Sequence, residues 1–259
     1  MKTAHLLLAF LLPGGHFLFA QQARFISSGR IEFEKTVNTY ALIKSGQLLG
    51  RNTAGREQQL FEQYQKIRPQ FKVLKSALHF SDNKTLFIPS EPGAPAAGFP
   101  DIPMIAQNNT VYADLLAGRT IIEKTIFDET FLLKDSVRKI NWKITDETRE
   151  IAGYTCRRAN ALILDSIYVV AFYAEKIHVA GGPESFSGLP GMILQLALPH
   201  EHVTWRATKV TDTVSAPGAV IPPQKGKPVD YRQLVNMLLQ AGKNRHPQTA
   251  NLIMKINLL

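Results

Sequence analysis

Histidine side chains give this sequence its most direct candidates for metal chemistry. His200 and His202 flank Glu201, and on a strand two residues at positions i and i+2 point to the same side. Neutral imidazoles are common ligands of zinc and copper, so these histidines together with His178 form a candidate metal site. Neither a further ligand nor groups that would orient the imidazoles can be recognised, and Pro199–His202 also fits a polar loop between two strands. We therefore expect neither a metal nor another cofactor.

Pairs of carboxylates could provide acid–base chemistry, since glycosidases use two carboxyl groups about 5–10 Å apart. Three such pairs stand out in the sequence: Glu32 with Glu34, Glu147 with Glu150, and Glu175 with Glu184. Spacing along the chain does not give the distance between the carboxyl groups, and charged solvent-facing strands or turns account for all three pairs. We therefore expect no catalytic residue among them.

The segment Ser185–Pro199 places two glycines and a proline directly before an apolar run. Leu189-Pro190-Gly191-Met192 fits a type II β-turn, because proline presets φ at the second position and glycine allows a positive φ at the third. A phosphate-binding loop would need backbone N–H groups at the start of a helix, whereas a strand is expected here. The spacing also differs from the Gly-x-Ser-x-Gly of hydrolases. We interpret the motif as a structural turn, with contact to a ligand as the alternative: Gly188, Leu189, Pro190 and Gly191.

The first twenty residues have the layout of a secretory signal peptide. Lys2 precedes the apolar run Leu6–Leu12, and the small residue Ala20 ends the segment. Pro13 interrupts the run well before the roughly 20 apolar residues that a membrane-spanning helix needs. We expect cleavage after Ala20, export to the periplasm, the outer membrane or the medium, and no transmembrane segment in the mature chain, residues 21–259.

Charge and cysteine content narrow the partners and the chemistry further. The formal net charge of +9 favours anionic neighbours such as lipid head groups, acidic glycans or acidic proteins. Nucleic acid is excluded as a partner of this exported chain, because its basic residues are scattered and no basic block is interleaved with aromatic residues. Cys156 is the only cysteine, so no intrachain disulfide can form. We expect it to be a small buried side chain at the start of a strand.

The hydrophobic pattern predicts a chain rich in strands. Alternating apolar residues indicate strands at Gly29–Val37, Phe71–Phe80, Thr85–Ile88, Thr120–Phe127, Thr130–Lys134, Arg138–Ile144, Cys156–Leu164, Ile167–Ala174, Met192–Leu198 and Val203–Val210. Apolar residues at helical spacing indicate helices at Arg56–Ile67 and Tyr231–Gln240. Because short connections join antiparallel neighbours, the expected fold is one β-rich α+β domain over residues 21–259. It is built on a twisted, curved antiparallel sheet or meander with two or three short helices.

Several motifs of the second half are similar to those of a known family. They include "TVYADLLAGR", "VVAFYAEKIHVAGGPESFSGLPGMILQLAL" and "VTWRATKV", and the hexapeptide at residues 188–193 reads GLPGMI. In order and spacing these motifs resemble the GLPGLI family over about Thr110 to Val210. The resemblance implies an exported cell-envelope protein of Gram-negative bacteria, often encoded near outer-membrane receptors, and no established biochemical activity. An outer-membrane receptor or another envelope protein is therefore an expected partner.

Three triplets combine an aspartate, a hydroxyl residue and a β-branched residue: Asp135-Ser136-Val137, Asp165-Ser166-Ile167 and Asp212-Thr213-Val214. The bacterial group implied by the resemblance often O-glycosylates exported proteins at triplets of this kind. Ser136, Ser166 and Thr213 are therefore candidate O-glycosylation sites. The alternative is that these residues begin turns, since Asp, Ser and Thr side chains hydrogen-bond their own backbone.

A curved sheet has a concave side, and such surfaces hold apolar ligands or partner segments. We therefore predict a non-enzymatic binding or accessory module of the periplasm or envelope, for an apolar ligand such as an amphiphile or for an envelope partner protein. The Pro- and Gly-rich loop at residues 89–103 is the expected lid or partner contact, with Phe99, Ile102 and the nearby Met104 as candidate binding residues. The alternatives are an envelope hydrolase acting on glycan or peptide, with metal assistance from His200 and His202, and a structural subunit of an envelope complex.

Overall fold

The computed structural model describes residues 25–44, 54–90, 109–126, 129–212 and 220–243. The expected signal peptide lies outside the described residues, as do Phe99, Ile102 and Met104 of the expected lid. Within the described ranges, no helix combines the length and the apolar character that crossing a membrane requires.

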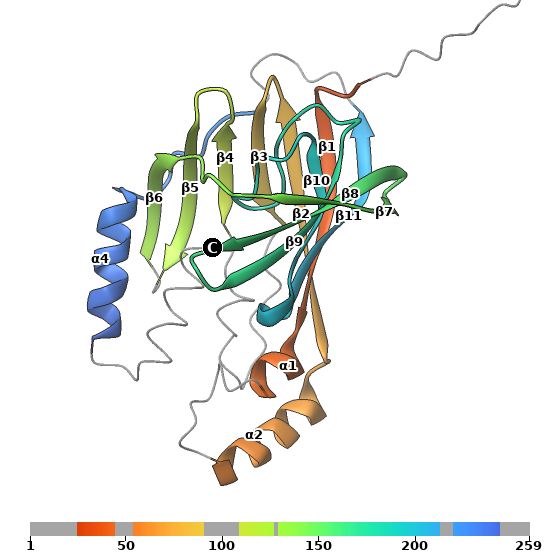
Figure 1. Cartoon of the computed structure of the whole chain (residues 1–259). Helices are drawn as coiled ribbons and strands as arrows, with labels where there is room; N and C mark the ends of the chain where they lie inside the picture. The colour runs from red at the N-terminus through yellow and green to blue at the C-terminus, as the bar shows by residue number, and fades with distance from the viewer. Residues whose placement is uncertain (1–24, 45–53, 91–108, 127–128, 213–219, 244–259) are drawn as a thin grey trace, which may run out of the picture.

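In the described part of the chain, one sheet of twelve strands forms the body of the protein (Figure 1). Its strands are β1 Gly29–Asn38, β2 Phe71–Ser81, β3 Lys84–Pro89, β4 Thr110–Asp114, β5 Arg119–Ile126, β6 Glu129–Ser136, β7 Lys143–Ile151, β8 Tyr154–Ile163, β9 Ile167–Ala174, β10 Met192–Leu198, β11 Val203–Asp212 and β12 Lys227–Val229. Across the sheet their order is β12-β6-β5-β4-β3-β2-β1-β11-β10-β9-β8-β7. Neighbouring strands are antiparallel except β12 and β6, which run parallel, so the sheet is mixed. The expected β-rich fold is confirmed.

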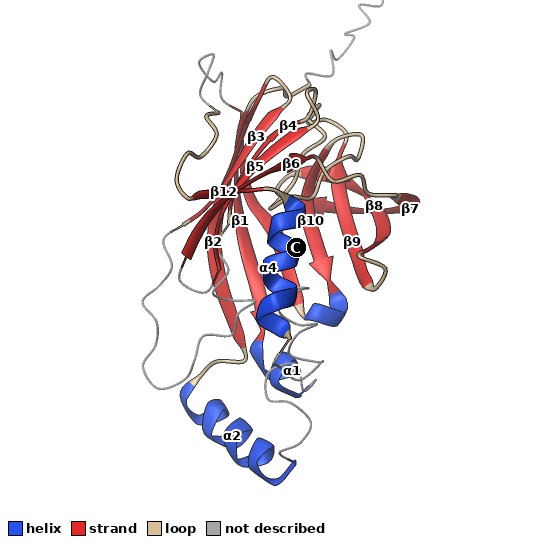
Figure 2. Ribbon diagram, turned by 90° about the vertical axis from the view of Figure 1, so that its left-hand side faces the viewer, coloured by secondary structure: helices blue, strands red, loops and turns tan. Residues whose placement is uncertain are grey.

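The sheet is strongly twisted, and its two ends are formed by different parts of the chain. β1 pairs with β11 and thereby joins the N-terminal strands β1–β6 to the C-terminal strands β7–β11. The pairings shift register at Glu32/Phe33, Ile144/Thr148 and Ile193/Gln195, and such bulges increase the local twist. In Figures 1 and 2, β7, β8 and β9 run in a clearly different direction from β3–β6.

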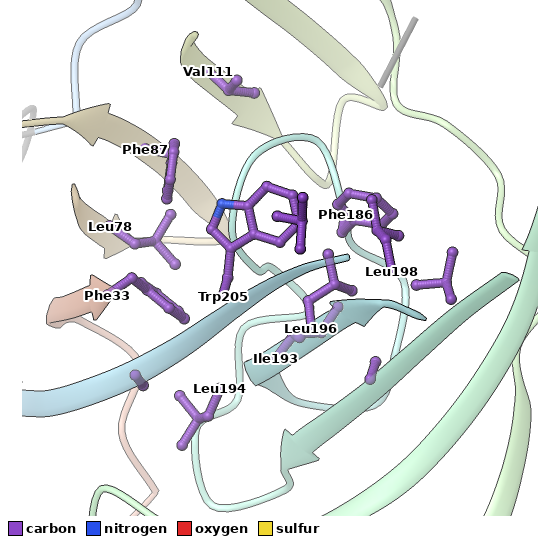
Figure 3. Close-up of a cluster of buried hydrophobic side chains, with 14 of the residues drawn as sticks. Phe33, Leu78, Phe87, Val111, Phe186, Ile193, Leu194, Leu196, Leu198 and Trp205 are labelled. Carbon is purple, nitrogen blue, oxygen red and sulfur yellow. The ribbon is translucent and has the colours of Figure 1, made fainter. Parts of the chain in front are cut away.

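The hydrophobic core lies on the side where strands from both ends of the sheet contribute side chains (Figure 3). Phe33 of β1 packs toward Phe87 of β3, with 6.4 Å between ring centroids. Phe186 lies between strands of the two ends, and its ring centroid is 6.4 Å from that of Trp205 on β11. Phe186 therefore anchors the connection between β9 and β10 in the core.

The α-helices lie at the margins of the sheet: α1 Thr39–Lys44, α2 Ala54–Ile67 and α4 Tyr231–Gly242. α2 and α4 confirm the two helices expected from apolar spacing. α4 begins with a capping box, in which Asp230 and Gln233 each accept a hydrogen bond from the other's backbone N–H. Leu234 and Leu238 are buried one turn apart, so the helix turns one apolar side inward beside β6.

The expected strand at Arg138–Ile144 is wrong. The alternation of Ile140, Trp142 and Ile144 predicts a strand, but the chain is irregular before Lys143, where β7 begins. The Trp142 indole N–H instead donates a 2.9 Å hydrogen bond to the carbonyl oxygen of Ser187, which holds the segment against the β9–β10 connection. β7 continues to Ile151 as an edge strand whose side chains are mostly charged and exposed, and this strand lacks the apolar alternation that sequence reasoning relies on.

Candidate functional site

A cleft of about 820 Å³ opens between the two ends of the sheet. Its floor is formed by side chains of β4, β5 and β6, and β8 supplies Leu162 and Ile163 on another wall. Residues 135–141 and 184–188 form further walls, and Tyr231 and Leu234 of α4 complete the lining. The lining therefore mixes apolar, polar and charged groups drawn from distant parts of the sequence.

The connection between β9 and β10 forms part of the cleft wall, and it is packed closely against neighbouring backbone and side chains. A Cβ on Gly182 would lie 2.8 Å from Cβ of Ile193, and a Cβ on Gly191 would lie 2.3 Å from the carbonyl oxygen of Ala174. Phe186 and Leu189 are each only 1% exposed, so they fix the segment to the core from within. These contacts pack the segment closely against the core.

The turn at that motif differs in detail from the expected type II turn. The Gly191 N–H donates to the carbonyl oxygen of Leu189 at 2.8 Å, so the hydrogen bond spans three residues centred on Pro190. Gly188 has φ +93° and lines the cleft. The motif thus contributes to the cleft wall as well as turning the chain into β10.

Glu184 is the carboxylate that this connection brings to the cleft. It is half-buried and has φ +52°, a left-handed conformation that side-chain-bearing residues adopt uncommonly. Asn109, just before β4, donates a hydrogen bond from Nδ2 to Glu184 Oε2 at 3.2 Å. A backbone conformation of this kind persists only where the surroundings enforce it, and such positions cluster at functional sites.

Two lysines lie inside the protein near this carboxylate. Lys124 of β5 is 3% exposed and lines the cleft, and Lys35 of β1 is 9% exposed. The Lys35 ammonium lies 5.0 Å from the centre of the Trp205 ring, a cation–π contact with the neighbouring strand β11. Buried lysines are rare unless an opposite charge compensates them, and Glu184 supplies that charge.

Burial and mutual attraction act in opposite directions on these groups. Burial lowers the pKa of Lys124 to about 8, although Glu184 opposes the shift. Burial also lowers the pKa of Lys35, again against the attraction of Glu184. For Glu184 burial raises the pKa, while Lys35, the hydrogen bond from Asn109 and Lys124 pull it down. The three groups therefore form one coupled, partly desolvated cluster.

Arg138 adds a further cation from the irregular segment before β7. It is half-buried and lines the cleft, and burial lowers its pKa, whereas Tyr231 and Asp135 oppose that shift. An arginine stays protonated in proteins despite such a shift.

The lysines of the cluster were missed from the sequence, although the sequence carries a signal for them. Residues at every second position of a strand share a face. Lys35 follows Ile31 and Phe33 in this pattern, and Lys124 lies between Ile122 and Ile126. A lysine in the middle of a core-facing apolar series therefore marks an inward-pointing charge.

The candidate metal histidines do not converge. The His178 ring stacks on Phe25 at 3.8 Å, and the His200 ring lies 6.5 Å from that of Tyr168. His202 has φ +56° and closes the 3₁₀ turn η1, Pro199–Glu201. In the part of the chain that the structure describes, no group of three or more His, Cys, Asp or Glu residues is placed to hold a metal ion.

The carboxylates of the expected pairs lie in different surroundings, and several of them form ion pairs with arginines. Glu32 forms an ion pair with Arg30 at 3.3 Å, and Glu147 pairs with Arg149 and Arg158 on the exposed side of β7 and β8. Glu175 pairs with Arg157 at 3.3 Å, whereas Glu184 lies in the cleft. Of these carboxylates, Glu184 is the one that lines the cleft, and within the described ranges the lining has one further carboxylate, Asp135.

The remaining candidate residues lie in different surroundings. Ser136 lines the cleft at the end of β6, and Ser166 lies in the turn between β8 and β9, where its hydroxyl donates to the Leu164 carbonyl oxygen at 3.2 Å. Thr213 lies outside the described residues. Cys156 is fully buried in β8, and burial raises the pKa of its thiol to about 12.

A known protein family matches the part of the sequence that supplies most of the cleft lining. Residues 105–233, just under half of the chain, match the family described as N-glycanase peptide, N-terminal domain. Lys124, Arg138 and Glu184 lie within the matched residues, and Lys35 lies outside them. No curated protein matches the sequence.

Two solved structures share the fold. A structure of PNGF-II in space group P21 superposes with a TM-score of 0.51 at 15% identity, covering 83% of this chain and 34% of that one. The C2 crystal form gives a TM-score of 0.51 at 14% identity, covering 83% and 33%. At this identity the likeness shows the fold alone, and the chain spans about a third of the length of these structures.

Proposed function

We propose that this protein is an exported, non-enzymatic module that binds a glycan in the cleft between the two ends of its sheet. The observation that carries the proposal is the location of the cleft: its charged wall residues Lys124, Arg138 and Glu184 all lie in the segment that matches the N-glycanase N-terminal domain family. A cavity of about 820 Å³ is within the size range of small-molecule sites, which suits a few sugar units.

The composition of the wall favours a hydroxylated ligand over the purely apolar one expected from the sequence. Sugars present hydroxyl groups at their rims and C–H groups on their faces. Asp135, Glu184 and Ser187 offer hydrogen-bonding groups, while Tyr231 offers an aromatic ring and Leu162 an exposed apolar side chain. A wholly apolar ligand would leave the polar wall groups without partners, which costs binding free energy.

Export and envelope association remain part of the proposal. They are supported by the signal-peptide layout of residues 1–20 and by the resemblance of Thr110–Val210 to the GLPGLI family. Glycans and glycopeptides are common outside the cytoplasm, so a glycan-binding module has its ligand there. The proposed partner is another envelope protein, such as an outer-membrane receptor.

A glycan hydrolase is the second candidate, and Glu184 is the observation that favours it. A carboxyl group whose pKa is raised by burial can give up a proton to a leaving group, and Asp135 supplies a second carboxylate in the same cleft. In such a hydrolase, acid–base chemistry at Glu184 would take the place of the metal assistance expected from His200 and His202.

The test measures binding and hydrolysis in parallel on the mature protein. We expect an array of N-glycans and glycopeptides to show saturable binding, and mass spectrometry to show intact glycopeptides after prolonged incubation. Release of glycan that is lost in Glu184→Gln would establish the hydrolase in place of the binding module. Absence of binding across the whole array would overturn the proposed function.

A further inference from the structure

The charges on the cleft wall do not balance. Among the residues that the structure describes, three cationic side chains line the cleft, Lys124, Arg138 and Lys139, against two carboxylates, Asp135 and Glu184. Lys35 lies behind the wall and shares Glu184 as its compensating charge. The wall thus carries an excess of one positive charge, and the buried part of the cluster is cationic as well. Within a partly desolvated cleft such an excess attracts an anion more strongly than it would at the open surface.

A buried hydroxyl group at the same wall has no hydrogen-bond partner among the described residues. Ser187 is 4% exposed and lines the cleft, and its Oγ hydrogen-bonds no group in the described part of the chain. Its carbonyl oxygen is held by the Trp142 indole, so the residue has a fixed position. A buried hydroxyl is normally hydrogen-bonded, and an anionic oxygen is a strong acceptor for it.

We propose that the glycan bound in the cleft carries a single anionic group, a carboxylate or a sulfate monoester, that lies against Lys124. The inference rests on the proposed function and specifies its ligand as an acidic sugar. Asp135 and Glu184 set the limit of one negative charge, because a dianion such as a phosphate monoester would meet repulsion from both carboxylates. Lys124 is the proposed anchor because it lines the cleft from the regular strand β5.

The test compares glycans that differ only in the acidic group. A sialylated biantennary N-glycan and its desialylated form supply the carboxylate arm, and a sulfated and an unsulfated form supply the sulfate arm. Titration calorimetry at pH 7 on the mature protein should show at least one acidic form binding roughly tenfold more tightly than its neutral counterpart, the factor expected for one partly desolvated charge pair.

Two variants locate the effect. Lys124→Met removes the ammonium and keeps the length of the side chain, so the acidic preference should fall to about twofold or less. Lys134→Met is the matched control, since Lys134 is exposed on neighbouring β6 and is absent from the cleft lining, and it should keep the full preference. Equal binding of acidic and neutral forms, or a preference that survives Lys124→Met, would overturn the inference while the glycan-binding function stands.

A measurement on the unmodified protein covers the case in which Lys124→Met fails to fold. The acidic preference should shrink between pH 7 and pH 9.5, because the ammonium of Lys124 loses its proton around pH 8 while Arg138 stays charged. Lys35 and Glu184 face the same ammonium, and Lys35 also loses charge in this direction as the pH rises. A preference independent of pH would overturn the inference. If neither form binds and the array is empty, the proposed function itself fails and the inference falls with it.

Discussion

The Trp142 indole Nε1–H donates a 2.9 Å hydrogen bond to the carbonyl oxygen of Ser187, so two irregular segments that form the cleft wall are joined directly. One segment carries Arg138 and leads into β7, and the other carries Glu184 and leads into β10. Neither segment has a regular ladder of backbone hydrogen bonds to hold it in place. This contact therefore ties the two segments to each other, in addition to the core packing of Phe186 and Leu189.

Replacing this indole should loosen the wall. Trp142→Phe keeps an aromatic ring but leaves the Ser187 carbonyl oxygen without its donor, which should lower the free energy of unfolding by about 1–2 kcal/mol. Urea unfolding monitored by far-UV circular dichroism measures this loss of stability. Hydrogen exchange of the backbone amides should accelerate at residues 184–188. Unchanged exchange in these residues would show that the core anchors alone hold the segment.

The pKa of Lys124 predicts a particular pH dependence of stability. Burial lowers the pKa from 10.5 to about 8 in the folded protein, so between these values the unfolded chain binds the proton more tightly. The free energy of unfolding should therefore rise as the pH increases through this window, by roughly 3 kcal/mol in total from this group. The measured quantity is the difference from Lys124→Met, which isolates the contribution of this ammonium.

The comparison has a built-in control. Lys134→Met should follow the unmodified protein across the window, because Lys134 is exposed to solvent on β6. Guanidinium unfolding at several values between pH 7.5 and pH 10.5 gives the curves. Parallel curves for Lys124→Met and the unmodified protein would show that the buried ammonium is better solvated than its position indicates.

Phe186 should be among the most sensitive core positions. Its ring is 1% exposed and touches the region between the two ends of the sheet, so Phe186→Ala should cost about 3–5 kcal/mol through lost contacts and a cavity. For a domain of this length that loss lowers Tm by about 10 °C. Phe71→Ala is the control, since that ring is 51% exposed, and its Tm should change by only a degree or two. Calorimetry that finds equal shifts would contradict the anchoring role of Phe186.

The thiol of Cys156 should be unreactive in the folded protein. It is fully buried, its Sγ–H donates to the Tyr154 carbonyl oxygen at 3.3 Å, and burial raises its pKa to about 12. The thiolate is the reactive form, so labelling by a thiol reagent at pH 8 should require prior unfolding. Stoichiometric labelling within minutes in native buffer would contradict this placement.

Periodic patterns predicted the regular parts of this fold well. The helices α2 and α4 and most strands from β1 to β11 follow the apolar spacing, because each buries one face and the side-chain period reveals it. β4 was not expected as a strand, and β12 has only three residues, too few for any period to be recognised. At Ile140 and Trp142 the alternation was present but a hydrogen bond to a distant segment prevailed over it.

The candidate site was much less predictable. Its members come from β1, β5, the segment before β7 and the β9–β10 connection, and their proximity depends on how the sheet twists. The residues next to Glu184 in the sequence do not show that it lies near Lys124, and the sequence suggested a pair with Glu175 instead. The core-facing position of Lys35 was readable from strand alternation, whereas the partner that makes its burial tolerable was not.

The two outer strands of the sheet also decide how this protein behaves beside copies of itself. An open sheet presents unpaired backbone groups at each edge, and a flat exposed edge invites another chain to add a strand. β7 is lined with exposed charges, among them Lys143, Asp146 and Glu150, and β12 has only three residues, with Pro228 in the middle. Both edges therefore discourage fibril-like stacking at high local concentration, and the twelve strands end as a finite body.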